Sequence, residues 1–366
     1  MSDLVAGWRD RVRAATASAT PLRIVGGGSM DFYGQRLAGE ILEVSGHAGI
    51  VDYDPTELVI TARCGTRLAE VEQAMAQSNQ MLAFEPPHFG PKATLGGSIA
   101  AGLSGPRRPY AGAVRDLVLG VRLLDGRGDE LAFGGRVMKN VAGFDVSRLI
   151  AGSLGTLGII LDVSLKCLPM PRAETTLTFE LPADEGLRRL NAWNATPLPL
   201  SASCWHQGRL HVRLSGAESA VAAAARRLGG EVLEQAKAYW VAVRDQTHDF
   251  FAPFRAQNGA EAAVPPAALW RLSVRVTAPH TAFGGATMIE WGGALRWVVA
   301  QEEDDAQQAR AWAAAQGGHA TLFRAADKSV GVFQPLPPAL LALHQRLKAA
   351  LDPAGIFNPG RMYAEL

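Results

Sequence analysis

Glycines gathered at three places are the feature that most constrains how this chain can fold. Two clusters lie at residues 26–28 and 96–97, and each is followed by a serine. The third stretch, residues 139–160, surrounds a short helical segment, Asp145 to Ala151, with Gly143, Gly152, Gly155 and Gly158. Glycine backbone is not shielded by a side chain, so its N–H groups can point at an anionic ligand. For one cluster a turn that lets a helix pass close to a strand is an equal alternative; three clusters favour the ligand.

Length, charge and cysteine usage limit the class of protein. At 366 residues the chain is long enough for two domains. Its formal net charge of +1 argues against nucleic-acid binding, which needs a clustered surplus of Lys and Arg. Cys64, Cys167 and Cys204 are far apart and form no Cys-x-x-Cys pair. They therefore indicate buried thiols in a reducing compartment, with neither disulfides nor a zinc or iron–sulfur site.

The N-terminal residues predict a docked helix and no targeting segment. No apolar run is long enough to cross a bilayer, and the N-terminus lacks the apolar core of a secretory signal. Leu4, Val5, Trp8 and Val12 fall on one helical face, which predicts a short helix against the body of the protein. We expect a cytoplasmic location.

Strand and helix patterns surround the first two glycine clusters. Residues 22–25 predict a strand that ends at the triple glycine. A βαβ-like unit is expected next, with its strand, helix and strand at 58–63, 66–78 and 81–84. We expect the Thr66 hydroxyl to cap that helix, and Ser98 to cap a helix that starts at Ile99.

The later elements of the first half end at a linker. A hairpin with an Asp-Gly turn is expected over residues 117–133, and a strand over 159–168. Residues 168–171, Leu-Pro-Met-Pro, then predict a linker.

The second half predicts two related units. The first has the βαββαβ order of a ferredoxin-like unit, with elements at 175–181, 184–193, 202–206, 210–214, 218–228 and 231–233. The order partly recurs, with strands and one helix at 270–277, 287–291, 295–300, 304–316 and 320–324. Side by side, two such units would make one continuous antiparallel sheet. Residues 239–254 between them, and 338–351 near the C-terminus, predict helices.

The glycine clusters, their order and the ending Asn358-Pro359-Gly360-Arg361 resemble a known family. They are similar to the vanillyl-alcohol-oxidase-type (PCMH) FAD-binding family, which includes D-lactate dehydrogenases and related 2-hydroxyacid oxidoreductases. The resemblance is close over residues 20–168. Within the family, the short length together with residues 144–149 and 290–293 looks most like the FAD-binding second subunit of bacterial glycolate oxidase (glycolate dehydrogenase).

The resemblance implies an α+β fold with FAD as cofactor. It implies a two-lobed PCMH-type FAD-binding domain over residues 1–170 and a cap domain with the antiparallel sheet over 171–335. A C-terminal segment, 336–366, would return to the FAD domain. By position, the resemblance implies cofactor contacts from Val25, Gly26, Gly27, Gly28, Ser29, Pro86, Thr94, Leu95, Gly96, Gly97, Ser98, Ala101, Gly102, Gly105, Gly152, Gly155, Thr156, Gly158, Ile159, Ile160 and Asn358.

Several features that self-sufficient members of the family carry are missing. They have cap histidines in a His-x-Gly-Asp-Gly-Asn-like run that bind metal and substrate, and this chain has no such run. His206 and His211 flank a Gln-Gly turn, where structural or solvated histidines are a better reading than a metal site. No histidine lies in the 26–34 loop, so we expect non-covalent FAD.

Other polar residues leave their roles open. His88, in a Pro-rich loop, is expected to contact either the ligand or backbone. Arg107 and Arg108 would anchor a substrate carboxylate, face a partner subunit or form a solvated basic turn. We expect Asp116 and Asp145 to be hydrogen-bonding struts. Two interpretations stay open for Lys139, for Trp291 beside Glu290, and for Arg361. Each would either contact the ligand or lie on the surface or in the core.

The missing machinery leads to three hypotheses about function. The first is the FAD-binding subunit of a glycolate oxidase complex, in which a sister FAD subunit carries out the hydroxyacid chemistry and an iron–sulfur subunit takes the electrons. The chain would then be cytoplasmic, with partner subunits able to hold it peripherally at the inner membrane. A self-sufficient flavin dehydrogenase for a hydroxyacid or alcohol is the second, and an assembly subunit with structural FAD is the third. A Rossmann NAD enzyme is disfavoured, because the fingerprint glycines and the acidic ribose partner are misplaced.

Overall fold

The computed structural model describes residues 3–135, 145–255, 267–281, 283, 285–300 and 305–366. These residues form two compact units. The first unit contains residues 1–104, 112–169 and 335–366, and the second contains residues 105–111 and 170–334. Lys139, Gly143 and Phe144 lie outside the described residues. The roles expected for the two parts, FAD-binding domain and cap domain, stay predictions.

The first unit is built on a five-stranded antiparallel sheet. Its strands, in spatial order, are β3 (Ile50–Asp54), β4 (Val59–Arg63), β8 (Ile159–Lys166), β6 (Val118–Leu124) and β7 (Glu130–Gly134). β6 and β7 form the expected Asp-Gly hairpin. Two small sheets accompany it, formed by the parallel pair β1 (Leu22–Val25) and β2 (Glu40–Glu43), and by β5 (Gln80–Met81) with β9 (Leu168–Pro169). The helices are α1 (Asp3–Ser18), α2 (Leu68–Ala76), α3 (Leu95–Ala101), α5 (Val114–Leu117), α6 (Val146–Ile150) and α11 (Pro338–Leu351).

The predicted βαβ-like unit is wrong. β4 belongs to the five-stranded sheet, whereas β5 is shorter than expected and pairs antiparallel with β9 in another sheet. The predicted Thr66 cap is also wrong, since α2 starts after Arg67 and the Thr66 hydroxyl donates to the carbonyl of Arg63 at 2.7 Å. A strand end next to the helix thus competes successfully for this hydroxyl.

The helix after the second glycine cluster begins earlier than expected. α3 starts at Leu95 and contains Ser98, so the predicted Ser98 cap is wrong. Thr94 is the N-cap instead, with its extended backbone and a side-chain oxygen that accepts from the N–H of Gly97. The helix ends at Gly102, whose φ of +67° is the left-handed C-cap conformation that glycine favours.

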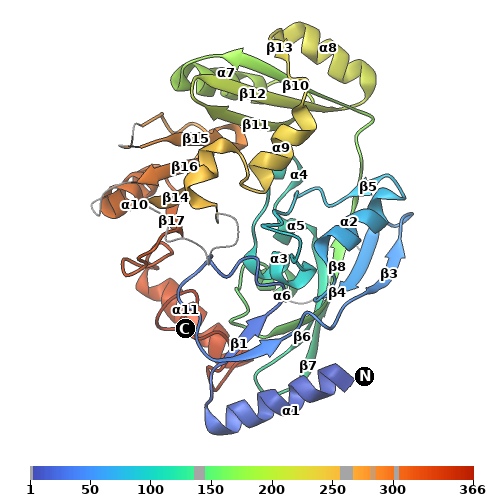
Figure 1. The fold of residues 1–366 in the computed structure, drawn as a ribbon, viewed down its shortest axis with the longest axis vertical. Coiled ribbons are helices and arrows are strands. Elements are labelled where there is room, and N and C mark those ends of the chain that lie inside the picture. Colours follow the sequence, from blue (N-terminus) through green and yellow to red (C-terminus); the bar gives the residue numbers. More distant parts are fainter. Residues whose placement is uncertain (1–2, 136–144, 256–266, 282, 284, 301–304) are drawn as a thin grey trace. The chain divides into compact units, whose positions relative to one another are not determined.

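Helix α1 packs on the first unit, with one correction to its expected face. Val5, Trp8 and Val12 are buried as predicted, together with Ala15. Leu4 is 48% exposed, so its assignment to the buried face is wrong. Figure 1 shows the other end of the chain, in red, returning to β1, where Leu22 and Phe357 form a parallel bridge.

The second unit contains one continuous eight-stranded antiparallel sheet, as expected. Its strands, in spatial order, are β13 (Glu231–Val232), β10 (Ala173–Glu180), β12 (Arg209–Gly216), β11 (Leu200–His206), β15 (Thr287–Glu290), β16 (Leu295–Ala300), β14 (Ala268–Ser273) and β17 (His319–Arg324). The first four strands have the ferredoxin-like order 4-1-3-2, and the last four repeat it in reverse. β11 and β15 join the halves.

Alternation along the strands gives the large sheet two different faces. One face carries two apolar clusters and packs against α7 (Ala183–Asn194), α8 (Glu218–Leu228) and α10 (Asp305–Ala315). The opposite face is more polar and receives α9 (Ala236–Arg244) and the 3₁₀ helix η1 (Asp249–Phe254). There the Trp240 indole donates to Thr176 at 2.8 Å, and the Phe251 ring lies 5.5 Å from that of Trp297.

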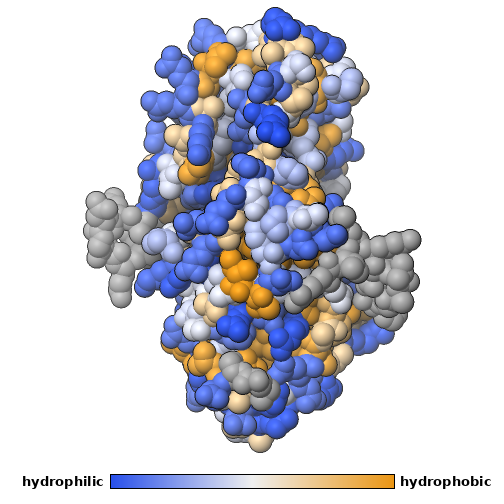
Figure 2. All heavy atoms as spheres, turned by 90° about the vertical axis from the view of Figure 1, so that its right-hand side faces the viewer, coloured by the Kyte–Doolittle hydropathy of each residue, from blue (hydrophilic) through white to orange (hydrophobic). Residues whose placement is uncertain are grey.

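The surface is mainly hydrophilic on the face shown in Figure 2, where apolar residues form small patches. In the first unit, the exposed large apolar side chains include Ile41 on β2, and Ile50 and Val51 on the edge strand β3. Among the described residues, no helix is both long and apolar enough to span a bilayer.

Candidate functional site

The first two glycine clusters are in contact with each other. A Cβ on Gly27 would lie 1.6 Å from the carbonyl oxygen of Lys92, and one on Gly26 would lie 2.7 Å from the Thr94 hydroxyl. Real Cβ atoms never come so close, so only glycine allows the turn after β1 to reach the start of α3. One step further along, a Cβ on Gly96 would lie 2.6 Å from the Cβ of Cys64. The backbone of both clusters is therefore held in one place.

The third cluster contacts the C-terminal end of α3, the helix that contains the second cluster. A Cβ on Gly102 would lie 2.7 Å from the Cα of Gly152, and the Gly152 N–H donates to the Ile99 carbonyl at 3.0 Å. Residues from positions 26 to 155 thus converge in one part of the first unit.

The C-terminal turn braces the same place. The Asn358 side chain accepts from the N–H of Ile24 at 2.9 Å and donates to the carbonyl of Leu154 at 2.7 Å. Arg361 donates to the carbonyls of Asp31, Tyr33 and Gln35 in the loop after the first cluster. Its guanidinium is buried and engaged within the protein, which favours a structural role.

Several polar groups at the convergence have no hydrogen-bond partner among the described residues. In the described residues, the N–H groups of Gly26, Gly27, Gly28 and Ser29 donate no hydrogen bond. The Ser98 hydroxyl is buried and also lacks a partner among these residues. Successive free N–H groups around a left-handed glycine, here Gly28 with a φ of +69°, form an anion-binding concavity. The arrangement fits the pyrophosphate of a dinucleotide such as FAD.

All of the predicted cofactor residues except Gly105 belong to the first unit, and Gly105 belongs to the second. Polar or backbone groups of several of these residues already contact other parts of the protein. The Thr156 hydroxyl donates to the Ser153 carbonyl, and the Thr156 carbonyl accepts from buried Lys348, each at 2.7 Å. A Cβ on Gly158 would lie 2.8 Å from the carbonyl of Leu124. The cofactor contacts of all the predicted residues stay predictions.

Other candidates from the sequence are engaged as struts. His88 Nε2 lies 3.0 Å from a carboxylate oxygen of Glu72. Asp116 accepts from the Ala113 N–H at 2.8 Å, and Asp145 accepts from the Ser147 hydroxyl at 2.8 Å, as expected for hydrogen-bonding residues.

Arg107 is not part of a solvated turn. It is 8% exposed and pairs with Glu174 at 2.8 Å within the second unit. Burial raises the pKa of Glu174, but Arg213, Ser215 and Arg107 outweigh this and leave the pKa below its ordinary value.

Trp291 is a buried residue with unusual backbone. It is 3% exposed, which agrees with the core reading, and its φ of +56° is a conformation that bulky residues rarely adopt. Its indole N–H donates to the Gly105 carbonyl at 3.1 Å, and the guanidinium of Arg108 lies 4.5 Å from the ring centre. Residues 105–111 are thereby fastened to the second unit.

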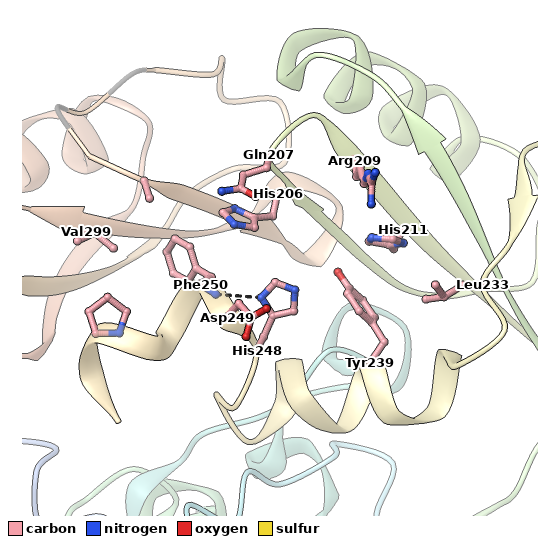
Figure 3. Close-up of a pocket in the computed structure, with 12 residues that line it drawn as sticks. His206, Gln207, Arg209, His211, Leu233, Tyr239, His248, Asp249, Phe250 and Val299 are labelled. Atoms are coloured by element: carbon pink, nitrogen blue, oxygen red, sulfur yellow. Dashed lines mark hydrogen bonds between the residues drawn. The ribbon is translucent and has the colours of Figure 1, made fainter. Parts of the chain in front are cut away.

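His206 and His211 line one cavity of the second unit (Figure 3). No group of three His, Cys, Asp or Glu side chains in the described ranges has metal-binding geometry. Tyr239 and His248, from α9 and the turn before η1, line the same cavity and were not singled out from the sequence. Their signal was weak, because single aromatic residues in a helical segment usually belong to a core.

Comparison with known proteins identifies the family. A family model described as FAD binding domain matches residues 6–134, and one described as FAD linked oxidases, C-terminal domain, matches residues 333–362. The chain is 47% identical over 357 residues to glycolate oxidase subunit GlcE of Escherichia coli strain K12, which covers 98% of this chain and 97% of that protein. This chain belongs to the GlcE family of glycolate oxidase subunits.

Members of wider groups resemble parts of this GlcE-family chain. Glycolate oxidase subunit GlcD of Bacillus subtilis is 33% identical over 129 residues, 35% of this chain and 27% of that protein. A D-lactate dehydrogenase of Archaeoglobus fulgidus is 31% identical over 136 residues, 37% of this chain and 30% of that protein. A solved structure of alkyldihydroxyacetonephosphate synthase has a TM-score of 0.61 at 14% identity, covers 96% of this chain and 73% of that protein, and supports the fold. The predicted family, α+β fold and FAD-linked oxidoreductase class are confirmed.

Proposed function

We propose that this chain is the FAD-carrying subunit of a glycolate oxidase complex. The observation that carries the proposal is the convergence of three glycine clusters on one set of free N–H groups, in a chain that matches GlcE over nearly its whole length. Oxidation of glycolate or a related D-2-hydroxyacid to a 2-oxoacid would be the reaction of the complex.

The residues of the first unit have the chemistry to hold FAD without a covalent bond. N–H groups of Gly26 to Ser29 would bind the pyrophosphate oxygens, and the Ser98 hydroxyl would complete the set. Thr94 caps the N-terminus of α3, and its hydroxyl lies beside Gly26. The positive end of the helix dipole is therefore next to the first glycine cluster. When bound, FAD supplies the two-electron acceptor for oxidation of the alcohol carbon. Among residues 26–34 there is no histidine to which the flavin would be attached.

The proposal assigns the remaining functions to partner subunits. A sister FAD subunit would carry out the substrate chemistry, and an iron–sulfur subunit would accept the electrons. The three cysteines support this division. All three are buried and separate, so they are unsuited to ligate a cluster.

FAD binding is tested by titrating the purified, flavin-free chain with FAD and following the quenching of flavin fluorescence. We expect a dissociation constant at or below micromolar and release of all flavin on denaturation in acid. Failure to take up FAD would overturn the proposal, and flavin that stays attached to the denatured chain would overturn its non-covalent form.

The division of labour is tested by comparing the FAD-loaded chain with the co-purified complex, using glycolate and a dye acceptor. We expect fast steady turnover from the complex and none from the chain alone. Anaerobic bleaching of the isolated chain's flavin by glycolate would instead indicate a self-sufficient dehydrogenase. Flavin that neither substrate nor partner reduces would indicate a structural cofactor.

A further inference from the structure

Helix α11 in the first unit carries an apolar stripe that is covered at only one end. Leu340, Leu343, Leu347 and Leu351 follow the spacing of a single helical face. Leu351 is buried and Leu347 is half-buried, whereas Leu343 is 51% exposed and Leu340 is 40% exposed. The face that packs on the first unit near the C-terminal end of α11 therefore continues for about two turns with its leucines exposed.

A small cavity of the first unit lies beside this stripe. Its volume is about 180 Å³, below the range of about 300 Å³ and more that is usual for small-molecule sites. Leu149 on α6 lines it and is 45% exposed, so the cavity opens to the surface there. The size suits one large side chain better than a nucleotide or a substrate with its cofactor. The apolar part of the lining is formed by Leu149, Ala151, Leu157, Leu347, Met362 and Leu366.

Three polar side chains of the lining already have partners within the protein. The Thr156 hydroxyl donates to the Ser153 carbonyl at 2.7 Å. The Lys348 ammonium group donates to three oxygen atoms, each at 2.7 Å. His344 Nδ1 lies 2.8 Å from the Leu340 carbonyl, which can only accept, so Nδ1 carries the proton. A polar ligand would gain few hydrogen bonds here, whereas an apolar side chain would leave all three groups satisfied.

The charge of α11 favours an acidic partner. Residues 335–351 contain no Asp or Glu, and Arg346 is exposed on α11. Arg148 on α6 is paired with Asp145 at 2.9 Å, and Glu365 is an exposed carboxylate next to the last lining residue. Arg346 is therefore the exposed cation beside the stripe, on a helix that has no carboxylate of its own.

These features distinguish a protein partner from a membrane surface. Exposed apolar surface with a polar rim is typical of both. A helix that lies on a membrane usually carries several cations opposite its apolar face. Within α11, which the structure describes throughout, Arg346 and Lys348 are the Lys and Arg residues, and Lys348 is buried. An apolar stripe beside a cavity for one side chain is instead typical of a groove that receives an amphipathic helix.

We propose that the α11 groove, formed by Leu340, Leu343, Leu347 and the cavity, binds an amphipathic helix of a partner subunit. One large apolar side chain of that helix enters the cavity, and others cover Leu340 and Leu343. A carboxylate of the same helix pairs with Arg346. The inference rests on the proposed function, since a subunit of a complex must present a surface to its partners. It adds which surface this is and the chemistry of the segment that covers it.

The test measures assembly of the FAD-loaded chain with its purified partner subunits by mass photometry over a concentration series. Leu343→Asp, at an exposed position that folding tolerates, should weaken assembly about tenfold or more, because the carboxylate would be buried against apolar groups. Arg346→Glu should weaken it about threefold and reduce its salt dependence. Val232→Asp, at an exposed apolar position of the second unit, is the matched control and should assemble like the unmodified chain.

A crosslink identifies the occupant of the groove. The three native thiols are buried, so a benzophenone maleimide should label a Leu343→Cys variant at the new thiol. Photolysis of the assembled complex should join this position to a peptide of a partner subunit that contains large apolar residues and at least one Asp or Glu. A crosslink only to a second copy of this chain, or to a peptide without an acidic residue, would overturn the proposal.

The remaining outcomes separate this inference from the proposed function. Normal assembly by Leu343→Asp would overturn the groove and leave the proposed function intact. Sedimentation with phosphatidylethanolamine–phosphatidylglycerol vesicles should show no binding; binding that Leu343→Asp abolishes would assign the groove to a membrane and overturn the proposal. An unmodified chain that assembles but takes up no FAD would contradict the proposed function alone. An unmodified chain that joins no partner would overturn both.

Discussion

The side chain of Asn358 accepts a hydrogen bond from the backbone N–H of Ile24 at 2.9 Å, across 334 positions of sequence. Ile24 lies in β1, two residues before Gly26 of the first glycine cluster. The same Asn358 amide donates to the carbonyl of Leu154, immediately before Gly155. Asn358 also has a φ of +40°, which asparagine tolerates better than most residues. One side chain therefore joins the ends of two glycine turns.

Asn358→Ala should loosen both turns at once. Each lost hydrogen bond leaves a partly buried backbone group without its partner, so we expect a loss of about 2 kcal/mol in the free energy of unfolding. Chemical denaturation measures this loss, and FAD titration should show weaker binding. Asn194→Ala, which removes a contact with Tyr110 in the second unit, is the matched control and should retain FAD affinity. Equal FAD affinity in the two variants would contradict this role for Asn358.

Gly27→Ala should prevent the first two clusters from meeting, because the added methyl group would overlap the Lys92 carbonyl. We expect either no FAD binding or insoluble protein. Gly7→Ala is the matched control, since nothing lies within 4 Å of a Cβ at that helical position. It should raise stability by about 0.5 to 1 kcal/mol. Normal FAD binding by Gly27→Ala would show that the turn is not held as described.

Lys348→Met should destabilise the first unit. The ammonium group is buried and donates at 2.7 Å to the carbonyls of Thr156 and Phe357 and to Asp352. Its loss leaves a buried carboxylate without its cation, which costs about 3 to 5 kcal/mol. The midpoint of urea unfolding measures the change. Lys237→Met, at an exposed position on α9, should unfold like the unmodified chain, and a similar midpoint in both variants would argue against a role for the buried ion pair.

The three thiols should be unreactive in the folded chain. Burial raises the pKa of Cys64 and of Cys167 to about 12 and that of Cys204 still higher. Thiolate is the reactive form. A disulfide reagent at pH 8 should therefore modify, on average, less than one thiol per native chain in the rapid phase. It should modify all three after unfolding in guanidinium. Rapid labelling of the native chain would mean that at least one thiol is accessible.

Acid should weaken the second unit through His211. Burial lowers its pKa in the folded chain to about 4, from 6.5 when unfolded, with His248 and Arg209 acting in the same direction. Between these pH values the unfolded chain binds a proton that the folded chain does not, so stability falls as the pH is lowered from 6.5 towards 4. Thermal unfolding of His211→Gln should show a smaller drop between pH 7 and pH 5. His344→Gln, on the exposed surface of α11, should keep the full drop.

Sequence patterns predicted the second unit well, because its strands and turns are determined by the pattern of apolar residues and glycines within each segment. Alternating apolar residues and Gly turns placed strands such as β11 and β12 within two residues of their observed ends. The ferredoxin-like order then fixed which strands are neighbours. Caps were less predictable, since the Thr66 hydroxyl had several acceptors within reach and its competition with the Arg63 carbonyl depends on tertiary structure.

The sequence predicted that the candidate site is built from glycine backbone, but it did not predict which segments contact each other there. The glycine clusters indicated close backbone approach, yet the partner of Gly27 is a carbonyl at Lys92 that no pattern marks. Likewise Tyr239 and His248 become neighbours of His211 only because α9 and η1 lie on the polar face of the sheet. Such pairings arise from packing between distant segments, and a single sequence does not encode them locally.

The return of the C-terminal residues to β1 has a consequence for synthesis on the ribosome. Ile356 and Phe357 pair with Leu22, so a segment that is synthesised late completes a structure that an early segment began. The intervening second unit can finish folding while the first still waits for its final turn. A released chain truncated before residue 356 would therefore contain the whole second unit and a β1 strand without its C-terminal partner.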